Sequence, residues 1–456
     1  MSIDIKNLTE KQRAFFSTGN TLDIDFRINA LKKLKAVIKE NEGDILDALK
    51  WDLNKSPFEA YATEVGFVYN ELNDAIRNIR KWCKAKRART PMTQFKSTSY
   101  IVSEPYGVVL IMSPWNYPFQ LTVAPLIGAV AGGNCAVVKP SAYSPATSAV
   151  LRRILSCFEK EYIAVVEGGR EANQELLNEK FDYIFFTGSV QVGKTVMEKA
   201  ARNLTPVTLE LGGKSPCIVD RDVDIDLAAR RIIWGKIINS GQTCVAPDYV
   251  YVHKDVKDSL IGSMKRYITV FYGEHPCENP QYPRIVNEKH FRRLLGLIDK
   301  EKVYYGGEYD ESGLRISPTI LENVTWEDAV MHEEIFGPIL PVLTYEDPEE
   351  IFSAITSRPK PLALYLFTRN RKFEHEIISR ISFGGGCIND TLVHLATPYM
   401  PFGGVGESGM GSYHGKWSFD TFTHKKSIMK KSCYIDIPLR YPPYENKIDL
   451  LKKIMK

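Results

Sequence analysis

The chain has 456 residues, of which 44% are hydrophobic and 25% charged, proportions that are ordinary for a globular protein of two or three domains. Its formal net charge of +4 is small for this length, so we expect no nucleic-acid or acidic-polymer partner. The eight cysteines include no C-x-x-C pair, and the eight histidines form no H-E-x-x-H motif. We therefore expect no disulfide framework and no metal site, and we expect a reducing, cytoplasmic compartment.

Two segments bear on membrane insertion. The N-terminal residues MSIDIKNLTEKQ lack the apolar stretch of a signal peptide. Residues Pro105–Val138 contain no charged side chain and are long enough to cross a bilayer. Four prolines and a Gly-Gly-Asn turn interrupt that segment, and a lipid-exposed helix could not satisfy the broken backbone bonds. We expect a buried strand, loop, helix and strand there, and no integral membrane segment.

The N-terminal region, to about Arg89, has a helical pattern. Its apolar residues recur at helical spacing, with Ile28, Leu31, Leu34 and Ile38 on one face. A basic cluster at 81–89 ends the region. Such a cluster could be a nucleic-acid patch, but we interpret it as the solvated end of a helix.

From Ser99 onward, short apolar runs alternate with helical stretches. Strands that are continuous apolar runs, separated by helices, indicate a parallel sheet covered on both faces. The predicted strands are Val108–Met112, Ala136–Val138, Ile163–Val166, Tyr183–Phe186, Val207–Leu211 and Ile218–Val219. The predicted helices are Phe119–Ala131, Ala146–Phe158, Gly193–Arg202 and Leu227–Ile238. The pattern resumes with Tyr249–Val252, Ile339–Leu343 and Leu362–Phe367, which indicates a second α/β unit.

One segment has the arrangement of a phosphate-binding turn. Residues Ile184–Lys194 read as a strand, a glycine turn and a helix start. A helix N-terminus attracts phosphate through its free N–H groups, and a glycine permits the tight turn before it. The full G-x-G-x-x-G fingerprint is absent, so an ordinary strand–helix turn is the favoured interpretation of this segment taken alone.

Three side chains are candidates for chemistry. Glu210 ends an apolar strand beside two glycines, where it could act as a general base or form a structural ion pair. Cys244 lies in a polar, glycine-containing loop, where it could be exposed and activated as a thiolate or remain inert. Asn116 follows a predicted strand, where its amide could bind an oxyanion or serve the turn.

Six ordered motifs together resemble the aldehyde dehydrogenase superfamily. The resemblance covers residues from about 10 to about 444, at family-like spacing. The motifs are PWNYPF at Pro114–Phe119, VVKPSA at Val137–Ala142, FTGS at Phe186–Ser189, LELGGKSP at Leu209–Pro216, GQTC at Gly241–Cys244 and EEIFGP at Glu333–Pro338. The C-terminal sequence at Pro401–His424, followed by RYPPY at Arg440–Tyr444, resembles the dimeric branch of this superfamily that is called class three. That branch handles medium- and long-chain aliphatic or aromatic aldehydes.

The resemblance implies an α/β fold with two Rossmann-like, doubly wound domains and a small β oligomerisation element. The cofactor-binding domain would comprise residues 1–95 and 104–208, and the catalytic domain residues 209–424. The oligomerisation strands would lie within 96–103 and 425–445, with a tail at 446–456. Tyr100–Ser103 and Cys433–Leu439 are the candidate strands for a homodimer, in which a hairpin extends the partner's sheet.

The resemblance also implies a mechanism. Cys244 would attack the aldehyde, and its backbone N–H and the Asn116 amide would hold the oxyanion. Glu210 would activate the water that hydrolyses the resulting thioester. Tyr117 and Trp234 match aromatic positions along the substrate tunnel.

The family's cofactor, NAD or NADP, implies a second group of residues. The positions that match are Lys139 at the adenine ribose, Gly188, Ser189 and Gly193 at the pyrophosphate, and Glu334 and Phe336 at the nicotinamide ribose and ring. One position departs from the family pattern, because Ala142 stands where many relatives have glutamate. That glutamate binds the ribose hydroxyl and repels a 2′-phosphate, so its loss opens the choice between NAD and NADP.

Two rival hypotheses keep the fold. An acylating enzyme would pass the acyl group to coenzyme A or work as a reductase, and Glu210 argues against it because a hydrolytic base would be wasted there. The second hypothesis is a protein that has kept the fold for binding or structural use, since a fold never guarantees activity. The presence of Cys244, Glu210 and Asn116 together argues against that one.

Overall fold

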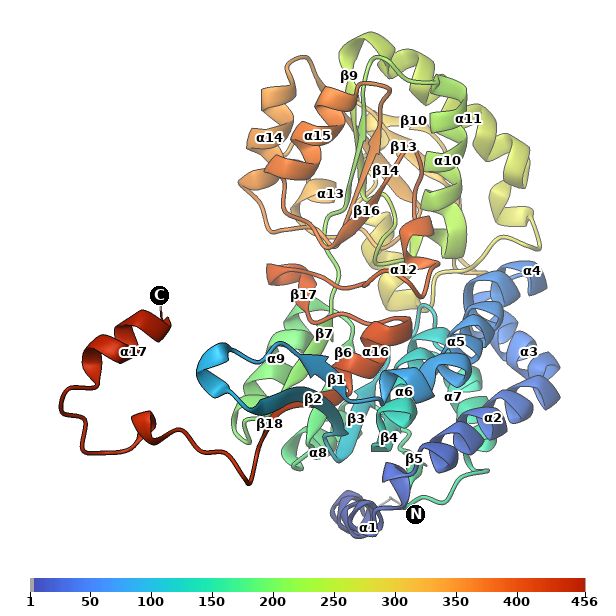
Figure 1. Cartoon of the computed structure of the whole chain (residues 1–456). Coiled ribbons are helices and arrows are strands. Elements are labelled where there is room, and N and C mark those ends of the chain that lie inside the picture. The colour runs from blue at the N-terminus through green and yellow to red at the C-terminus, as the bar shows by residue number, and fades with distance from the viewer. Residues whose placement is uncertain (1–3, 456) are drawn as a thin grey trace.

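The structure is a computed structural model that describes residues 4–455. Two lobes, each built around one sheet with helices on its faces, lie one above the other in Figure 1. A small three-stranded sheet lies beside the lower lobe, and the C-terminal segment extends away from it. The predicted α/β class is confirmed.

The lower lobe contains a six-stranded sheet in the order β17-β7-β6-β3-β4-β5. Every neighbouring pair is parallel except β17 with β7. The strands are β3 (Val108–Met112), β4 (Cys135–Lys139), β5 (Ile163–Val165), β6 (Tyr183–Thr187), β7 (Val207–Glu210) and β17 (Gly409–Met410). The first five were predicted to within one residue at each end. Their apolar runs are the reason, because β3, β4 and β6 are buried throughout.

Helices connect these strands, and because the strand order reverses at β3, right-handed crossovers place them on both faces of the sheet. They are α6 (Gln120–Gly132), α7 (Pro145–Leu155), α8 (Arg170–Asn178) and α9 (Val190–Ala201). Every residue of α6 is buried, which explains the uncharged stretch in the sequence. The helix α7 ends at Leu155, three residues before the predicted end, and the short polar α8 had no predicted counterpart.

The N-terminal region is helical, as its periodicity predicts. The helices are α1 (Ile5–Ser17), α2 (Ile24–Glu40), α3 (Glu42–Leu53), α4 (Pro57–Ala60), the π-helical turn η2 (Tyr61–Val65) and α5 (Gly66–Trp82). The predicted apolar face of α2 is buried, with Leu31 and Ile38 completely inaccessible. The basic cluster at 81–89 includes the end of α5, as expected, but it continues into a short strand, β1 (Lys86–Ala88).

The upper lobe contains the second α/β unit, a seven-stranded sheet in the order β10-β13-β14-β9-β8-β15-β16. Its strands are β8 (Pro216–Val219), β9 (Tyr249–His253), β10 (Val303–Tyr305), β13 (Thr319–Leu321), β14 (Ile339–Tyr345), β15 (Ala363–Phe367) and β16 (Gly385–Ile388). All pairs except β10 with β13 are parallel. The helices are α10 (Ile225–Ile237), α11 (Lys257–Tyr272), α12 (Glu288–Leu295), α13 (Ala329–His332), α14 (Pro348–Thr356) and α15 (Arg371–Arg380), and a hairpin pairs β11 (Tyr309–Asp310) with β12 (Arg315–Ile316).

The chain then returns to the lower lobe. There β17 pairs with β7, and α16 (Gly415–Thr421) packs against α6 and α5. The small sheet has the order β1-β2-β18, and β18 (Thr423–Lys431) pairs along the whole of β2 (Ser97–Pro105).

One of the two predicted oligomerisation strands is present. Tyr100–Ser103 lies within β2, whereas residues 433–439 form no strand within the described single chain, and their pairing with a partner's sheet stays a prediction. The ladder ends at the pair Lys431 and Ser97, with one further hydrogen bond from the Ser432 N–H to the Lys96 carbonyl oxygen, and a short helical turn with Pro438 follows. The chain ends in α17 (Ile448–Met455). Within residues 4–455, no helix is both long enough and apolar enough to cross a membrane.

A glycine on α6 permits the close approach of α16. A Cβ atom on Gly128 would lie 2.8 Å from the Cβ of Ser418 and 3.2 Å from the Ser418 carbonyl oxygen. We expect Gly128→Ala to lower the free energy of unfolding by about 1–3 kcal/mol through overpacking. Gly262 in α11 is the control, because a Cβ there meets nothing within 4 Å and alanine gains about 0.8–1 kcal/mol of helix propensity. Urea denaturation of both variants measures the difference, and equal effects would contradict this packing argument.

Candidate active site

The carboxyl ends of the lower-lobe strands meet at one edge of the sheet. Ligands bind in parallel sheets where the strand order reverses, and here it reverses around β3, between β4 and β6. Asn116 follows β3, Lys139 ends β4, Gly188 follows β6 and Glu210 ends β7. Four of the residues singled out from the sequence therefore belong to one edge because each comes at the end of a parallel strand.

The upper lobe supplies Cys244 through a kinked loop after α10. Asn239 and Ser240 both have left-handed backbone conformations, with φ of 50° and 52°. Gly241 follows with φ of 72°, and a Cβ there would collide with the Gly337 carbonyl group. The loop therefore turns sharply against the upper lobe, and this turn carries the partly buried Cys244 to the junction of the two lobes.

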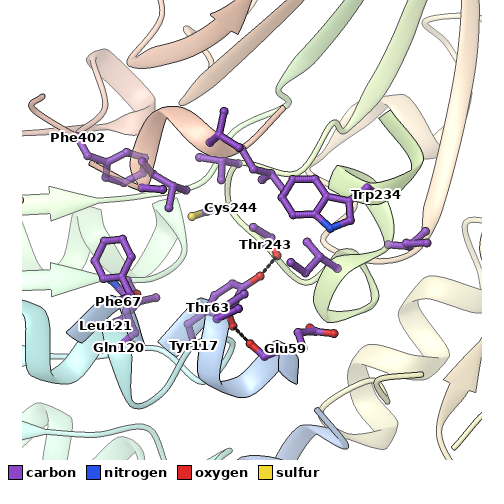
Figure 2. A pocket seen from close by; sticks show the side chains of 18 of the residues that line it. Glu59, Thr63, Phe67, Tyr117, Gln120, Leu121, Trp234, Thr243, Cys244 and Phe402 are labelled. Carbon is purple, nitrogen blue, oxygen red and sulfur yellow. Dashed lines mark hydrogen bonds between the residues drawn. The ribbon is translucent and has the colours of Figure 1, made fainter. Parts of the chain in front are cut away.

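Two cavities meet at this junction. One of about 670 Å³ is lined mainly by apolar and aromatic side chains, among them Phe67, Trp234 and Phe402 (Figure 2). The other, of about 750 Å³, is lined by Gly188, Ser189, Glu334 and Phe336 among others. Both cavities are lined by Leu121, Thr187, Glu210, Leu211 and Cys244. The thiol and the carboxyl group therefore stand where the two spaces join.

The thiol is not pre-ionised, contrary to the expectation of an exposed thiolate. Burial raises the pKa of Cys244 to about 12, and the carboxyl groups of Glu334 and Glu210 raise it further. The polar sequence of the loop suggested exposure, but the fold places the loop between two lobes. In this state the sulfur carries its proton, and a base or another charge must assist ionisation.

Glu210 is 3% exposed, and neither carboxyl oxygen has a hydrogen-bond partner among residues 4–455. Burial raises its pKa well above the ordinary value. The structural ion pair considered from the sequence is not formed within the described chain. An unpartnered buried carboxyl group is costly, so it is a candidate for proton transfer rather than for stability.

Asn116 is held with its amide facing the cysteine loop. Its Nδ2 donates to the Gln242 carbonyl oxygen at 3.0 Å. The backbone carbonyl oxygen of Asn116 accepts hydrogen bonds from Asn239 Nδ2 at 2.8 Å and from Lys55 Nζ at 2.9 Å. Because an amide nitrogen has two hydrogens, one remains for a substrate oxygen.

The sequence analysis missed a buried charged cluster beneath this loop. Lys55 and Glu64 form a fully buried ion pair, with 2.5 Å between Nζ and Oε1. The other Glu64 oxygen accepts the N–H groups of Phe119 and Gln120. The signal available in the sequence was a charge inside an apolar helical run, since burying one is costly without a partner. Nothing in the sequence identified the partner.

The residues matched to the nicotinamide end are close to the thiol. Glu334 is partly buried and packs so tightly on Gly212 that a Cβ there would overlap its carboxyl group. Burial, helped by Asp248, raises the pKa of Glu334 to about 8. Phe336 has a left-handed backbone with φ of 52°, and its ring meets Trp115 edge-on at 5.3 Å.

The phosphate turn is built as a strand, a glycine and a helix. Gly188 and Ser189 line the larger cavity, and Ser189 caps α9. Gly193 does not line it. A Cβ at Gly193 would meet the Leu211 side chain at 2.6 Å, so this glycine serves the packing of α9 on the sheet.

Lys139 and Ala142 lie at the end of β4, outside the lining of both cavities. Lys139 is 4% exposed, and its Nζ donates to the Pro140 carbonyl oxygen at 2.9 Å. Burial lowers its pKa to about 8. Ala142 is exposed.

Both predicted substrate residues line the smaller cavity. The Tyr117 hydroxyl group and Thr243 Oγ1 are 2.6 Å apart, next to Cys244 (Figure 2). Trp234, on α10, is 41% exposed and lies toward solvent. In the described chain, 4–455, no cluster of three or more His, Cys, Asp or Glu side chains could hold a metal ion.

Comparison with known proteins identifies the family. Residues 2–428 match the family described as "Aldehyde dehydrogenase family". The chain belongs to the aldehyde dehydrogenase family. As such it is an oxidoreductase that converts aldehydes to acids with NAD or NADP.

The relatives of this aldehyde dehydrogenase place it near the family 3 members. It is 51% identical to the 4,4'-diaponeurosporen-aldehyde dehydrogenase of Staphylococcus aureus, over 97% of each chain. It is 46% identical to aldehyde dehydrogenase family 3 member H1 of Arabidopsis thaliana, over 100% of this chain and 95% of that one. It is 45% identical to the "Aldehyde dehydrogenase, dimeric NADP-preferring" of Rattus norvegicus, over 97% and 99%.

A solved structure supports the same assignment. "Substrate bound state of Staphylococcus Aureus AldH" superposes with a TM-score of 0.98 at 50% identity, with 100% of each chain covered. The family resemblance that the six sequence motifs carried is thereby confirmed, and so is the fold that it implied.

The raised pKa of Cys244 predicts how its reactivity depends on pH. Because only the thiolate is alkylated, and because the pH stays below a pKa of about 12, inactivation by iodoacetamide should accelerate about tenfold per pH unit from about pH 7 to pH 9. The measurement is loss of activity in cofactor-free enzyme, with mass spectrometry of the Cys244 peptide. A rate that levels off near neutral pH would show an ionised resting thiol instead.

Proposed function

We propose that the chain oxidises apolar aldehydes to carboxylic acids through a thioester on Cys244. The observation that carries this proposal is the position of Cys244 and Glu210 at the junction of an apolar cavity and a second cavity. A nucleophile at such a junction can meet an aldehyde from one side and a cofactor from the other.

The first step forms a bond between the Cys244 sulfur and the aldehyde carbon. The thiol proton must leave, and Glu210 is an unpartnered carboxyl group lining the same two cavities. Negative charge then develops on the aldehyde oxygen, where the free hydrogen of the Asn116 amide and the Cys244 N–H would stabilise it. Electrostatic stabilisation of this kind contributes about 3–4 kcal/mol for one donor.

NAD or NADP, when bound, supplies the acceptor for the hydride that leaves the aldehyde carbon. Three features fit such a group: a cavity at the reversal of strand order, the free N–H groups at the start of α9, and Glu334 beside Gly212. Glu334 would bind the ribose hydroxyls, Phe336 would contact the nicotinamide ring, and Gly188 and Ser189 would face the phosphates. Lys139, with ammonium hydrogens beyond the one used on Pro140, would reach the adenine ribose.

Hydrolysis of the thioester completes the reaction. Glu210 would first release the thiol proton to solvent and would then take a proton from water as that water attacks the acyl carbon. The bond between the acyl carbon and the Cys244 sulfur breaks, the acid is released, and the sulfur recovers a proton to return the thiol. Burial raises the pKa of Glu210, and a carboxylate with a raised pKa is a stronger base toward water than an ordinary one.

The substrate class follows from the lining of the smaller cavity. Its walls are mainly apolar and its volume of about 670 Å³ suits a medium- or long-chain aliphatic or an aromatic aldehyde. Tyr117 and Trp234 would contact the chain of the substrate. A relative named for 4,4'-diaponeurosporen-aldehyde is in keeping with this class.

We also propose a cytoplasmic homodimer. The name of the Rattus norvegicus relative describes that protein as dimeric. In this chain β18 pairs on one side only, with β2, so its outer edge is free to pair with another copy. None of the eight cysteines of the chain is in a disulfide, in keeping with a reducing compartment.

Two substitutions test the thioester mechanism. We expect Cys244→Ala to abolish oxidation of hexanal while cofactor binding persists, because the nucleophile alone is removed. Glu210→Gln should give at most one burst of reduced cofactor and then stall, because the thioester forms but is not hydrolysed. Rapid-mixing absorbance with and without coenzyme A measures both. Unchanged steady-state turnover in either variant would refute that residue's role, and acceleration by coenzyme A would favour an acylating enzyme.

The residue at position 142 tests cofactor selection. A carboxylate there would face a 2′-phosphate of about −1.5 to −2 charge. With Ala142 in place, we expect NADP to be used within about tenfold of NAD, a gap of ~1.4 kcal/mol. Ala142→Glu should shift the kcat/KM ratio toward NAD, with Ala142→Gln as the uncharged control. If the glutamate variant keeps the wild-type ratio, position 142 does not contact the ribose.

A further inference from the structure

The apolar cavity contains a second carboxyl group that the mechanism does not use. Glu59, on α4, lines the apolar cavity. In Figure 2 it lies farther from Cys244 than Tyr117 and Thr243 do. It is 8% exposed, whereas a glutamate on a helix surface is ordinarily solvated. A buried carboxyl group in an apolar tunnel is costly, so its place there calls for a role.

One of its oxygens is engaged and the other is not. Oε1 accepts the backbone N–H of Asn239 at 2.7 Å, which belongs to the kinked loop before Cys244. Within residues 4–455, Oε2 receives no hydrogen bond from a side chain or backbone group. The carboxyl group is therefore tied to the loop on one side and available to the cavity on the other.

The charges around Glu59 do not cancel its own. The nearest cation, Lys55, is paired with Glu64 at 2.5 Å, so Lys55 and Glu64 together are neutral and Glu59 adds one negative charge. The other titratable groups that face it, Tyr117, Tyr272 and Tyr282, carry no positive charge. No lysine or arginine is among the described residues that line the cavity, and the histidine that lines it, His414, lies 3.3 Å from the Glu71 carboxyl group. A negative charge in a substrate tunnel of low polarity acts over a long range, because little water screens it.

We propose that Glu59 is a specificity-determining residue that excludes aldehydes carrying an anionic group at their far end and admits neutral ones. This inference rests on the proposed function, since the excluded molecules are aldehyde substrates that would enter by this cavity. A carboxylate-bearing aldehyde would place its charge against Glu59 with no cation to offset it. A neutral amide or alkyl end meets no such repulsion, and an amide can donate to the free Oε2.

The exclusion should weaken in acid. Burial raises the pKa of Glu59 to about 6, while Lys55 and the Asn239 N–H act in the opposite direction. Above that pH the group is ionised and repels anions. Below it the group is neutral and the repulsion is lost, whereas a simple carboxylic acid substrate stays ionised to about pH 4–5.

The test compares isosteric substrates at two lengths, the pair 4-formylbenzoate and 4-formylbenzamide and the pair 9-oxononanoate and its amide. For the wild type we expect kcat/KM to favour the amide by at least tenfold in one or both pairs at about pH 7.5, and the preference to shrink toward about pH 5.5. Glu59→Gln should reduce the preference to less than threefold, because Gln keeps an acceptor for Asn239 but loses the charge. Glu59→Asp is the matched control, since it keeps the charge but is too short for the same contact with the loop.

Because the readout is a ratio, any common effect on the loop cancels. A wild-type preference that survives in Glu59→Gln, or that disappears equally in Glu59→Asp, would overturn the proposal and leave Glu59 with only a positioning role. A wild type that oxidises both members of each pair equally would also overturn it. If neither these compounds nor hexanal is oxidised, the proposed function itself fails, which is a separate outcome.

Discussion

The geometry of the reactive centre depends on the buried ion pair between Lys55 and Glu64. Such a pair is tolerated only if its remaining donors and acceptors are used, and removing one partner costs about 3–5 kcal/mol. Here Lys55 also binds the Asn116 carbonyl oxygen, and Glu64 binds the N–H groups at the start of α6. The pair therefore fixes the loop after β3 against the N-terminal helices. The Asn116 amide, in turn, keeps its direction toward the cysteine loop.

The centre is assembled from three ionisable groups that lie where burial disfavours charge. Burial raises the pKa values of Cys244, Glu210 and Glu334 together, because each loses water in the same narrow junction between the lobes. Ionising one of them makes ionising the next harder, so a proton moves between them more readily than a second charge appears. Because burial raises the pKa of Cys244 to about 12, the resting thiol has little thiolate character, which protects it from oxidation.

The sequence predicted the parts of this enzyme that depend on local pattern. β3 and β6 were predicted because they are uninterrupted apolar runs. Glu210 was singled out because it ends an apolar strand, and Cys244 because it lies in a polar, glycine-containing loop. What it could not predict depends on distant contacts. Glu59 meets Asn239 across 180 positions of sequence, and the burial of Cys244 arises only when two lobes close over one loop. The strand expected at Cys433–Leu439 depends in the same way on a distant contact, because it would pair with the sheet of a second copy.

The two cavities share only inner walls. The side chains common to both are buried or nearly so, whereas each cavity has its own exposed rim, with Phe58 and Val270 at one and Gln191 and Glu407 at the other. The aldehyde and the nucleotide would therefore enter through separate rims. With the aldehyde and the nucleotide in these two cavities, as proposed, the acid would leave through the rim by which its aldehyde entered while the nucleotide stays in place. The nucleotide would likewise be exchangeable while an acyl group is still attached. Neither ligand would have to leave before the other could enter.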